Sequence, residues 1–275
     1  MRKFSSRPAA LTRIAAAAFT LMLVVGGASA ADGSNSTDAA TEAKLKTYLA
    51  GPQRGAENKA RDSYRHPLET LKFFGLNDTM TVMEIWPGGG WWTEFLAPAL
   101  AEKGKYIAAQ PNAKAVASLQ EKSTKDAANF GKMQVVTFPD AAVAPGSVDM
   151  ILTFRNMHNW MGRGEEKKMF DAMYAALKPG GYLGIKEHRA PTTAPQDPKA
   201  ASGYVREDFA IKTAESSGFK LVSKSEINAN PKDTKDYPKG VWTLPPNYAE
   251  GDKDKAKYTA IGESDRFTML FQKPK

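Results

Sequence analysis

Short apolar runs that alternate with segments of helical spacing are the feature that most constrains the fold of this chain. Apolar residues recur at helical spacing in 92–100 and in 169–177. Strands that alternate with helices form crossover units, so we predict an α/β fold whose mainly parallel sheet is covered by helices on both faces. Apolar runs of strand length lie at 81–86, 105–109, 133–138, 148–154, 182–186 and 219–223.

The end of the chain departs from this alternation. A seventh strand is predicted at 266–272, but it follows a long polar segment, 228–264, instead of a helix. An edge hairpin with the sixth strand, or an antiparallel insertion beside it, would explain this order. Because Gly, Pro, Lys and Asp dominate residues 228–264, we predict a flap with little structure of its own.

The first thirty residues have the pattern of a secretory signal peptide. They combine a basic start, an apolar run over 14–25 and a small-residue ending at Ala28, Ser29 and Ala30. The run is shorter than the roughly 20 residues that span a bilayer, so no stable membrane anchor is expected after cleavage. We expect cleavage after Ala30 and a periplasmic or secreted protein.

The remaining chain divides into two predicted parts. Residues 31–75 form an N-terminal helical segment or lid, with a short helix at 42–50 and an amphipathic piece after Pro67 that Gly75 closes. Residues 76–275 form the α/β domain, which carries the polar insertion 228–264. The sequence has no feature that predicts an oligomeric state.

Charge and composition exclude several functions. The chain has 38 basic and 30 acidic residues, a formal charge of +8; residues 1–30 hold four basic residues and no acidic one, so removing them leaves +4. This mild excess is not concentrated in patches, which disfavours nucleic acid as a partner and leaves a small molecule. The absence of cysteine excludes disulfides, thiol catalysis and thiolate metal sites.

A glycine-rich turn follows the first predicted strand, in the stretch MTVMEIWPGGGWWTE (80–94). In a parallel sheet, ligands bind beyond the carboxyl ends of the strands, where the strand order reverses. Glycine allows positive φ and close approach of the backbone, so the turn is suited to a nucleotide-like ligand. A tight turn that needs glycine for packing alone is the alternative.

Two motifs resemble those of class I S-adenosylmethionine-dependent methyltransferases. VMEIWPGGG (82–90) resembles the first motif of that family, and LKPGGYLGI (177–185) resembles its helix-to-fifth-strand segment. The resemblance extends over about 81–273. It implies a Rossmann-like seven-stranded sheet whose antiparallel last strand lies between the fifth and the sixth, and S-adenosylmethionine as cofactor.

The resemblance also implies roles for the residues of the turn. Glu84 would orient the loop and the methionine end of the cofactor, and Gly88 and Gly90 would hold the second and third glycine positions. Trp86 stands where the first glycine usually lies, and its ring face is suited to attract a sulfonium. The implied cofactor-binding turn comprises Glu84, Trp86, Pro87, Gly88, Gly89 and Gly90.

Two further cofactor contacts are implied by position. Where the family usually has an acid for the ribose hydroxyls, this chain has Gln110 or Asn112, which can still hydrogen-bond. After the third strand, Asp140 matches the position that meets the adenine amine.

The end of the fourth strand, FRNMHNW (154–160), lies where the substrate side of the family begins. It offers Arg155, Asn156 and His158 as catalytic candidates. His158 is the preferred general base because its unperturbed pKa of about 6.5 suits proton removal near neutrality. A histidine bonded to the backbone that merely closes the strand is the structural alternative.

Weaker candidates surround this group. Glu187 and His188 end the fifth strand and would face the same crevice, where with His158 and His66 they offer zinc ligands in principle. Their wide spacing contains no short metal-ligand motif, so we predict no metal. Two pairs are expected to close over the substrate: Tyr64 with Arg65, and Tyr204 with Arg206.

Together these features predict an exported S-adenosylmethionine-dependent methyltransferase that acts on an unidentified small molecule. The alternative is a non-catalytic periplasmic module that binds another small molecule with a methyltransferase-like fold, because fold similarity does not establish activity. Trp86 and Gln110 are the departures that such a module would show.

Overall fold

The computed structural model describes Met1 and residues 36–140 and 143–275, and the latter two ranges belong to one compact unit. Apart from Met1, the predicted signal peptide lies outside the described residues. No helix within the described ranges combines the length and the hydropathy needed to cross a bilayer.

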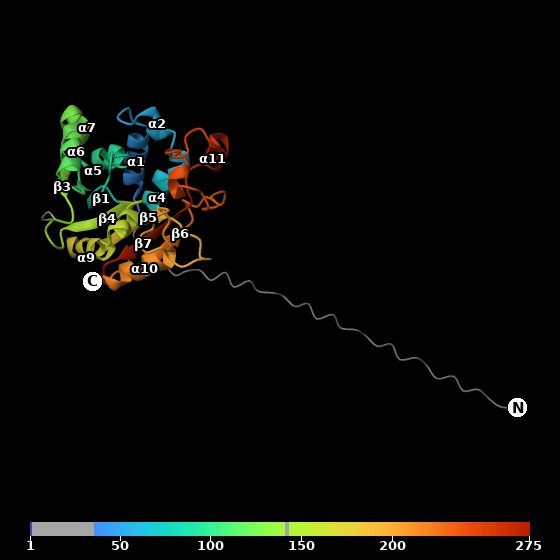
Figure 1. Cartoon of the computed structure of the whole chain (residues 1–275). Helices are drawn as coiled ribbons and strands as arrows, with labels where there is room; N and C mark the ends of the chain where they lie inside the picture. The colour runs from blue at the N-terminus through green and yellow to red at the C-terminus, as the bar shows by residue number, and fades with distance from the viewer. Residues whose placement is uncertain (2–35, 141–142) are drawn as a thin grey trace. The chain divides into compact units, whose positions relative to one another are not determined.

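A seven-stranded sheet in the order β3-β2-β1-β4-β5-β7-β6 forms the centre of this unit (Figure 1). Neighbours from β3 to β5 pair in parallel, whereas β7 pairs antiparallel with both β5 and β6. The predicted fold class and the predicted place of the last strand are therefore confirmed. The strands are β1 (Thr81–Ile85), β2 (Lys105–Gln110), β3 (Gln134–Thr137), β4 (Val148–Phe154), β5 (Leu177–His188), β6 (Lys220–Ser225) and β7 (Arg266–Gln272).

Helices precede, connect and flank these strands. They are α1 (Ala39–Ala50), α2 (Ala56–Lys59), α3 (Asp62–Arg65), α4 (Pro67–Phe74), α5 (Thr93–Leu100), α6 (Ala113–Lys125), α7 (Ala127–Phe130), α8 (Met157–Arg163), α9 (Glu166–Ala176), α10 (Glu207–Ser216), α11 (Lys255–Ile261) and the 3-10 turn η1 (Gly240–Thr243). Local signals explain several bounds. Asp38 caps α1 by accepting from the Thr41 N–H, and α4 ends at Gly75 with φ +70°.

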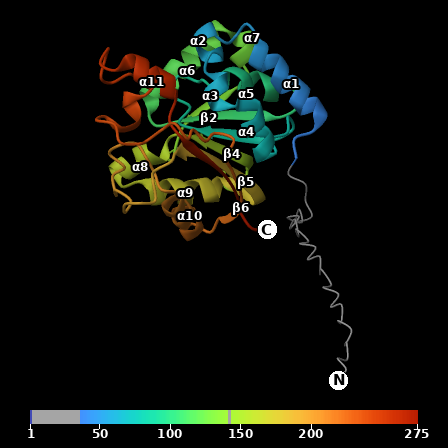
Figure 2. The ribbon, with the colours of Figure 1, turned by 90° about the vertical axis from the view of Figure 1, so that its right-hand side faces the viewer.

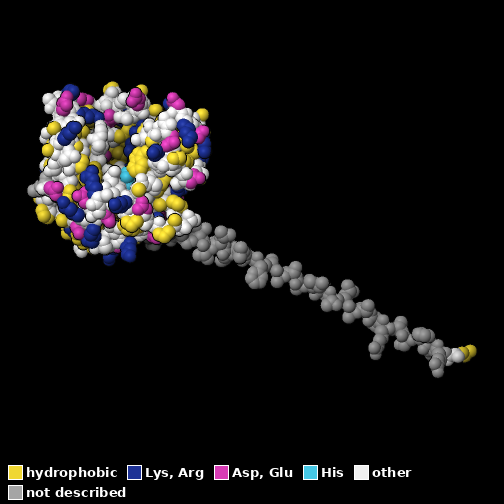
Figure 3. Space-filling view, viewed as in Figure 1, with side chains coloured by type: hydrophobic (Ala, Val, Ile, Leu, Met, Phe, Trp, Pro, Cys, Tyr) yellow, Lys and Arg dark blue, Asp and Glu magenta, His cyan; other side chains and the backbone are white. Residues whose placement is uncertain are grey.

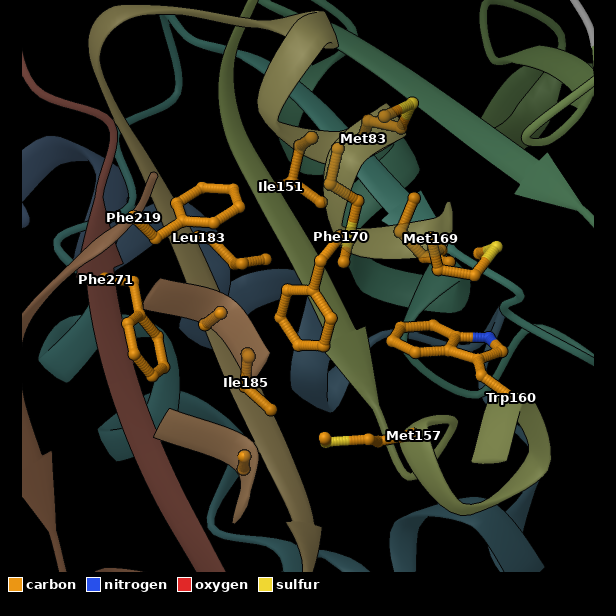
Figure 4. Packing of buried hydrophobic residues seen from close by; sticks show 14 of the residues in the cluster. Met83, Ile151, Met157, Trp160, Met169, Phe170, Leu183, Ile185, Phe219 and Phe271 are labelled. Carbon is orange, nitrogen blue, oxygen red and sulfur yellow. The ribbon is translucent and has the colours of Figure 1, made fainter. Parts of the chain in front are cut away.

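Both faces of the sheet are covered, as the apolar strands require (Figure 2). On one face, α1, α4 and α5 pack through residues such as Leu45, Phe74 and Phe95. On the other, α8, α9 and α10 cover β4 and β5, and Figure 4 shows Phe170 of α9 beside Ile185 of β5. Burial of this apolar surface is the main stabilising contribution, at about 25 cal/mol per Å².

The prediction of a flap with little structure at 228–264 is wrong in part. The segment contains η1 and α11, and Val241 and Leu244 are buried in it. Buried hydrogen bonds explain why this segment is ordered. Buried Asn228 donates to Thr70 and Thr268, so the segment is tied to α4 and to β7 by hydrogen bonds that a composition of Gly, Pro and Lys does not reveal.

The carboxyl ends of the parallel strands bring the predicted site residues to one edge of the sheet. Trp86 follows β1, Gln110 ends β2, Arg155 follows β4 and His188 ends β5. Because β7 is antiparallel, it begins at this same edge, with Arg266.

Candidate active site

The glycine turn offers bare backbone to a ligand. Trp86, Gly88 and Gly90 have φ values of +46°, +59° and +84°, so the turn has the left-handed conformations that glycine permits. A Cβ added to Gly88 or Gly89 would meet no atom within 4 Å, whereas one on Gly90 would lie 3.2 Å from Cβ of Thr93. Gly88 and Gly89 therefore face open space, and Gly90 serves packing against α5.

A cavity of about 370 Å³, the glycine-turn cavity, lies beside these residues. A second depression of about 410 Å³, the outer hollow, lies on the β2 side and shares Trp86, Gly88, Gly89 and Asn156 with it. The glycine-turn cavity is lined by Asn58, Arg61, Arg65, Glu84, Trp86, Pro87, Gly88, Gly89, Trp91, Trp92, Phe154, Arg155 and Asn156. The outer hollow adds Gln110, Pro111, Ala115 and Ser118. The shared wall suits an elongated ligand laid across the turn.

Trp86 forms part of this wall. Its indole Nε1 donates to the Phe138 carbonyl at 3.1 Å, and its ring meets Trp160 edge to face at 6.0 Å. The guanidinium of Arg163 lies 5.1 Å from the ring centroid. The indole is thus fixed beyond the end of β2, between the end of β3 and α8.

Glu84 lies at the end of β1 and is almost fully buried. Tyr106 and Thr93 donate to its carboxylate, which links β1 to β2 and to the start of α5. Burial raises the pKa of Glu84 to about 7, although these two hydrogen bonds and the charge of Arg65 lower it. The predicted orienting acid is therefore partly protonated near neutrality.

Gln110 is the ribose-side candidate that the structure brings to the turn. Its Nε2 donates to the Gly88 carbonyl at 3.1 Å, while its buried Oε1 has no hydrogen-bond partner among the described residues. An unpartnered buried acceptor at a cavity wall is suited to a ligand hydroxyl. Asn112, the alternative, instead caps α6 by accepting from the Ala115 N–H.

Asp140 does not join the site. Its carboxylate is largely exposed and pairs with Lys168 of α9 at 3.0 Å, and it lines neither the glycine-turn cavity nor the outer hollow. The adenine contact implied for Asp140 therefore has no support in its position.

A third cavity, of about 230 Å³, lies at the ends of β4 and β5. We call it the histidine cavity; it is lined by Arg155, His158, His188, Val241, Trp242, Pro245, Pro246, Asn247, Ser264 and Arg266. Arg155 lines both this and the glycine-turn cavity, so the two adjoin at its side chain. The face drawn in Figure 3 is hollowed near its centre, with a histidine side chain inside the hollow.

His158 is held by a buried carboxylate. Its Nδ1 lies 3.1 Å from Oε1 of Glu187, and Glu187 also accepts from the backbone N–H groups of Met157 and His188, at 2.7 and 2.8 Å. A carboxylate at Nδ1 favours the tautomer with the proton on Nδ1, which leaves Nε2 free to accept one. This is the arrangement of a general base oriented by an acid.

His188 completes the cluster. Its Nδ1 is hydrogen-bonded to Ser264, and burial, with positive charge from His158 and Arg266, lowers its pKa well below the usual range. The ligand atoms of His158, Glu187 and His188 lie within 4.8 Å of one another, close enough for a metal ion. The carboxylate already accepts three hydrogen bonds and two guanidiniums line the cavity, so the electrostatics favour an anion over a cation.

Of the catalytic candidates, Asn156 has a structural contact. Its amide donates to the Ile85 carbonyl at 2.7 Å and to the Thr153 hydroxyl, which joins the ends of β1 and β4.

Among the residues expected to close over the substrate, Arg65 lines the glycine-turn cavity. Tyr204 instead donates to Asp233, and Arg206 pairs with Asp208 at the surface.

Sequence reasoning missed an ion cluster around Glu263. This buried carboxylate accepts from Arg61 at 2.6 Å, from Arg65 at 3.3 Å and from Arg266. The sequence contained a signal for this cluster, because an antiparallel last strand begins at the ligand edge and an arginine opens the mostly apolar strand there.

The strand order, with a glycine turn at the point where it reverses, first defines the fold class as a Rossmann-like α/β protein. A family model described as a methyltransferase domain matches residues 82–181. This stretch of the chain is therefore similar to a methyltransferase domain, and the strand order agrees with that similarity. The chain has no match among curated protein sequences.

Solved structures share this fold at low identity. An S-adenosylmethionine-dependent methyltransferase from Aquifex aeolicus is 20% identical over 84% of this chain and 98% of that chain, with a TM-score of 0.55. The (4+2) cyclase SpnF is 14% identical over 82% and 86%, with a TM-score of 0.55. Phosphoethanolamine N-methyltransferase 2 from Haemonchus contortus, in complex with S-adenosylmethionine, is 17% identical, with a TM-score of 0.53; the match covers 85% of this chain and 57% of that chain.

The residues around the turn fit S-adenosylmethionine in three respects. The open space over Gly88 and Gly89 would admit an elongated molecule against bare backbone, and the unpartnered Oε1 of Gln110 would accept from a hydroxyl. Arg61 and Arg65 would meet a carboxylate in the glycine-turn cavity. Only the adenine end lacks the contact that the family resemblance implied.

Proposed function

We propose that this protein is an exported methyltransferase that transfers the methyl group of S-adenosylmethionine to a small molecule in the periplasm. The observation that carries the proposal is the open backbone of Gly88 and Gly89, which forms the common wall of two depressions at the switch point of a methyltransferase fold. Export rests on the signal-peptide pattern of residues 1–30.

The chain's own residues supply positioning and a base. Arg61 and Arg65 would bind the carboxylate of the amino-acid end, and Gln110 a ribose hydroxyl. When bound, the cofactor would supply a methyl group on a positively charged sulfur, which would keep the electron pair of the broken bond as the acceptor bonds to the methyl carbon. Such transfer depends on alignment and exclusion of water, which buried walls provide.

His158 would remove the proton of the acceptor. Its Nε2 is free when Nδ1 donates to Glu187, and the imidazolium formed would be stabilised by that carboxylate at 3.1 Å. General-base catalysis of this kind contributes about 10²- to 10⁴-fold in rate. His158→Ala should therefore slow turnover and spare cofactor binding.

Calorimetric titration with S-adenosylmethionine and S-adenosylhomocysteine tests the proposal. The purified protein should bind both below about 1 mM. Gly89→Val should abolish binding, because its side chain would enter the shared space; Gly89 lies outside the left-handed region, so the change adds no backbone strain. Gly55→Val is the matched control, since Gly55 also meets no atom within 4 Å and lines neither depression.

Binding that survives in Gly89→Val would show that the site assignment is wrong. Absence of binding in the unaltered protein would favour the second candidate, a periplasmic module that binds another small molecule. The fixed indole of Trp86 and the outward position of Asp140 favour that candidate. The likeness to the cyclase SpnF supports it only in showing that this fold also occurs in a protein named for another activity.

A further inference from the structure

The histidine cavity carries more positive charge than its neighbours neutralise. Arg266 is 1% exposed; it donates to Glu263 and to the Tyr64 carbonyl, yet its buried Nε has no partner among the described residues. The guanidinium of Arg155 forms no hydrogen bond or ion pair with any residue in the described ranges. Arg155 and Arg266 thus both line the histidine cavity, and each guanidinium has at least one N–H donor without a hydrogen-bond partner among the described residues.

The nearest carboxylates do not offset this charge. Glu263 already accepts from Arg61, Arg65 and Arg266. Burial, with the positive charge of Arg266, lowers the pKa of Arg155 to about 10, so it stays protonated at neutrality. An uncompensated charge in a buried site costs several kcal/mol, which a bound anion would offset.

The backbone of Arg155 is held in an uncommon conformation. Its φ is +62°, in the left-handed region that residues other than Gly, Asn and Asp rarely adopt. The N–H of Arg155 donates to the Lys186 carbonyl at 2.7 Å, which fixes this geometry against β5. The result is a cation placed where the two cavities adjoin. Backbone strain of this kind persists mainly at functional sites.

We propose that the histidine cavity binds an acceptor bearing a carboxylate or phosphate group, which Arg155 and Arg266 hold while His158 faces its nucleophilic hydroxyl, amine or thiol. The acceptor role rests on the proposed methyl transfer. In that role the acceptor's proton passes to Nε2 of His158 as the new bond to the methyl carbon forms. The volume of about 230 Å³ limits the bound part to a small molecule.

Thermal unfolding with three probes tests the anion site without any cofactor. Lactate and glycerol 3-phosphate pair a hydroxyl with a carboxylate and a phosphate, and glycerol is the neutral control; KCl keeps the ionic strength constant. We expect at least one anion to raise the melting temperature in a saturable way and glycerol to leave it unchanged. Equal stabilisation by glycerol, or none by either anion, would overturn the proposal.

Variants locate the anion. Arg155→Gln should weaken the binding of the effective probe by about 10- to 100-fold, the range of a charge-assisted hydrogen bond, and Arg155→Lys should restore part of it. Lys212→Gln removes the same charge from an exposed position on α10 and should change nothing. An unchanged affinity in Arg155→Gln would exclude the site.

Arg61→Gln separates the two cavities. Arg61 lines the glycine-turn cavity but not the histidine cavity. A loss in Arg61→Gln as large as in Arg155→Gln would place the anion in the glycine-turn cavity and refute the proposal. Without any probe, Arg155→Gln should melt at or above the temperature of the unaltered protein, because an unpaired, half-buried cation is removed.

Titration of the same preparations with S-adenosylmethionine distinguishes this proposal from the preceding one. Cofactor binding without anion binding would contradict the anion site and leave the proposed methyl transfer intact. Anion binding at Arg155 without cofactor binding would support the site and contradict the methyl transfer.

Discussion

Two buried carboxylates at the same edge of the sheet have opposite surroundings. Glu84, 2% exposed, accepts from the neutral hydroxyls of Tyr106 and Thr93, and burial raises its pKa to about 7. Glu263, 3% exposed, is also buried, but Arg266 and other arginines lower its pKa far below the usual range. Equal burial thus gives one acid that is half neutral and one that stays ionised.

The two acids therefore have opposite effects on stability as pH changes. Glu263 binds protons less readily in the folded state, so its contribution is present above the unfolded pKa of about 4.3 and is lost as pH falls. Glu84 binds them more readily, so its contribution is present below that pKa and is lost as pH rises toward about 7. Glu84, the partly neutral acid, lines the glycine-turn cavity. Glu263, the ionised acid, pairs with arginines that line the two cavities.

The largest expected effect is that of Glu263→Gln at pH 7. It leaves three guanidiniums without their carboxylate, and breaking a buried ion pair on one side costs about 3–5 kcal/mol. Urea unfolding followed by tryptophan fluorescence measures the loss. Glu121→Gln is the matched control, because Glu121 pairs with Lys125 on an exposed helix face and should leave the unfolding free energy unchanged. Equal effects of the two variants would mean that burial does not distinguish these pairs.

The next effect is that of Glu84→Gln, which replaces a titrating acid by a permanently neutral one. The unfolding free energy of the unaltered protein should fall relative to the variant by about 2–3 kcal/mol between pH 5 and pH 8, from a pKa shift of about 2.5 units. Urea midpoints at several pH values measure it. Parallel profiles would show that Glu84 ionises normally, and Glu121→Gln should give parallel profiles.

The fold was predictable because its signals are local and repeated. Apolar runs predicted every strand, with β5 extending five residues earlier than expected, from Leu177 instead of Tyr182. The place of β7 came from the family resemblance together with the missing crossover helix. The order within 228–264 was not predictable, since it depends on buried contacts such as those of Asn228 with Thr70, far apart in sequence.

The candidate site was predictable only where strand ends fix it. Glu84 and Gln110 lie at the ends of β1 and β2, and Gly88 and His158 follow β1 and β4 within four residues, so the sheet brings them to one edge. Glu263 and Arg61 lie in connecting segments about 200 residues apart, and only the tertiary fold makes them a pair. Asp140 has the family's position in sequence, but its loop directs it to Lys168.

The smallest predicted effect is that of Gln110→Leu. Its comparison with Asp140→Asn tests whether the family's position in sequence or the observed geometry identifies the cofactor contact. Gln110→Leu removes the unpartnered Oε1 and the bond to the Gly88 carbonyl, so it should weaken S-adenosylmethionine binding by about 10-fold, the value of one hydrogen bond. Asp140→Asn should leave the affinity unchanged, because that side chain lines neither depression. Calorimetric titration measures both. The reverse order, with Asp140→Asn the weaker binder, would mean that the loop after β3 rearranges around the adenine and that the exposed pair with Lys168 opens when ligand binds.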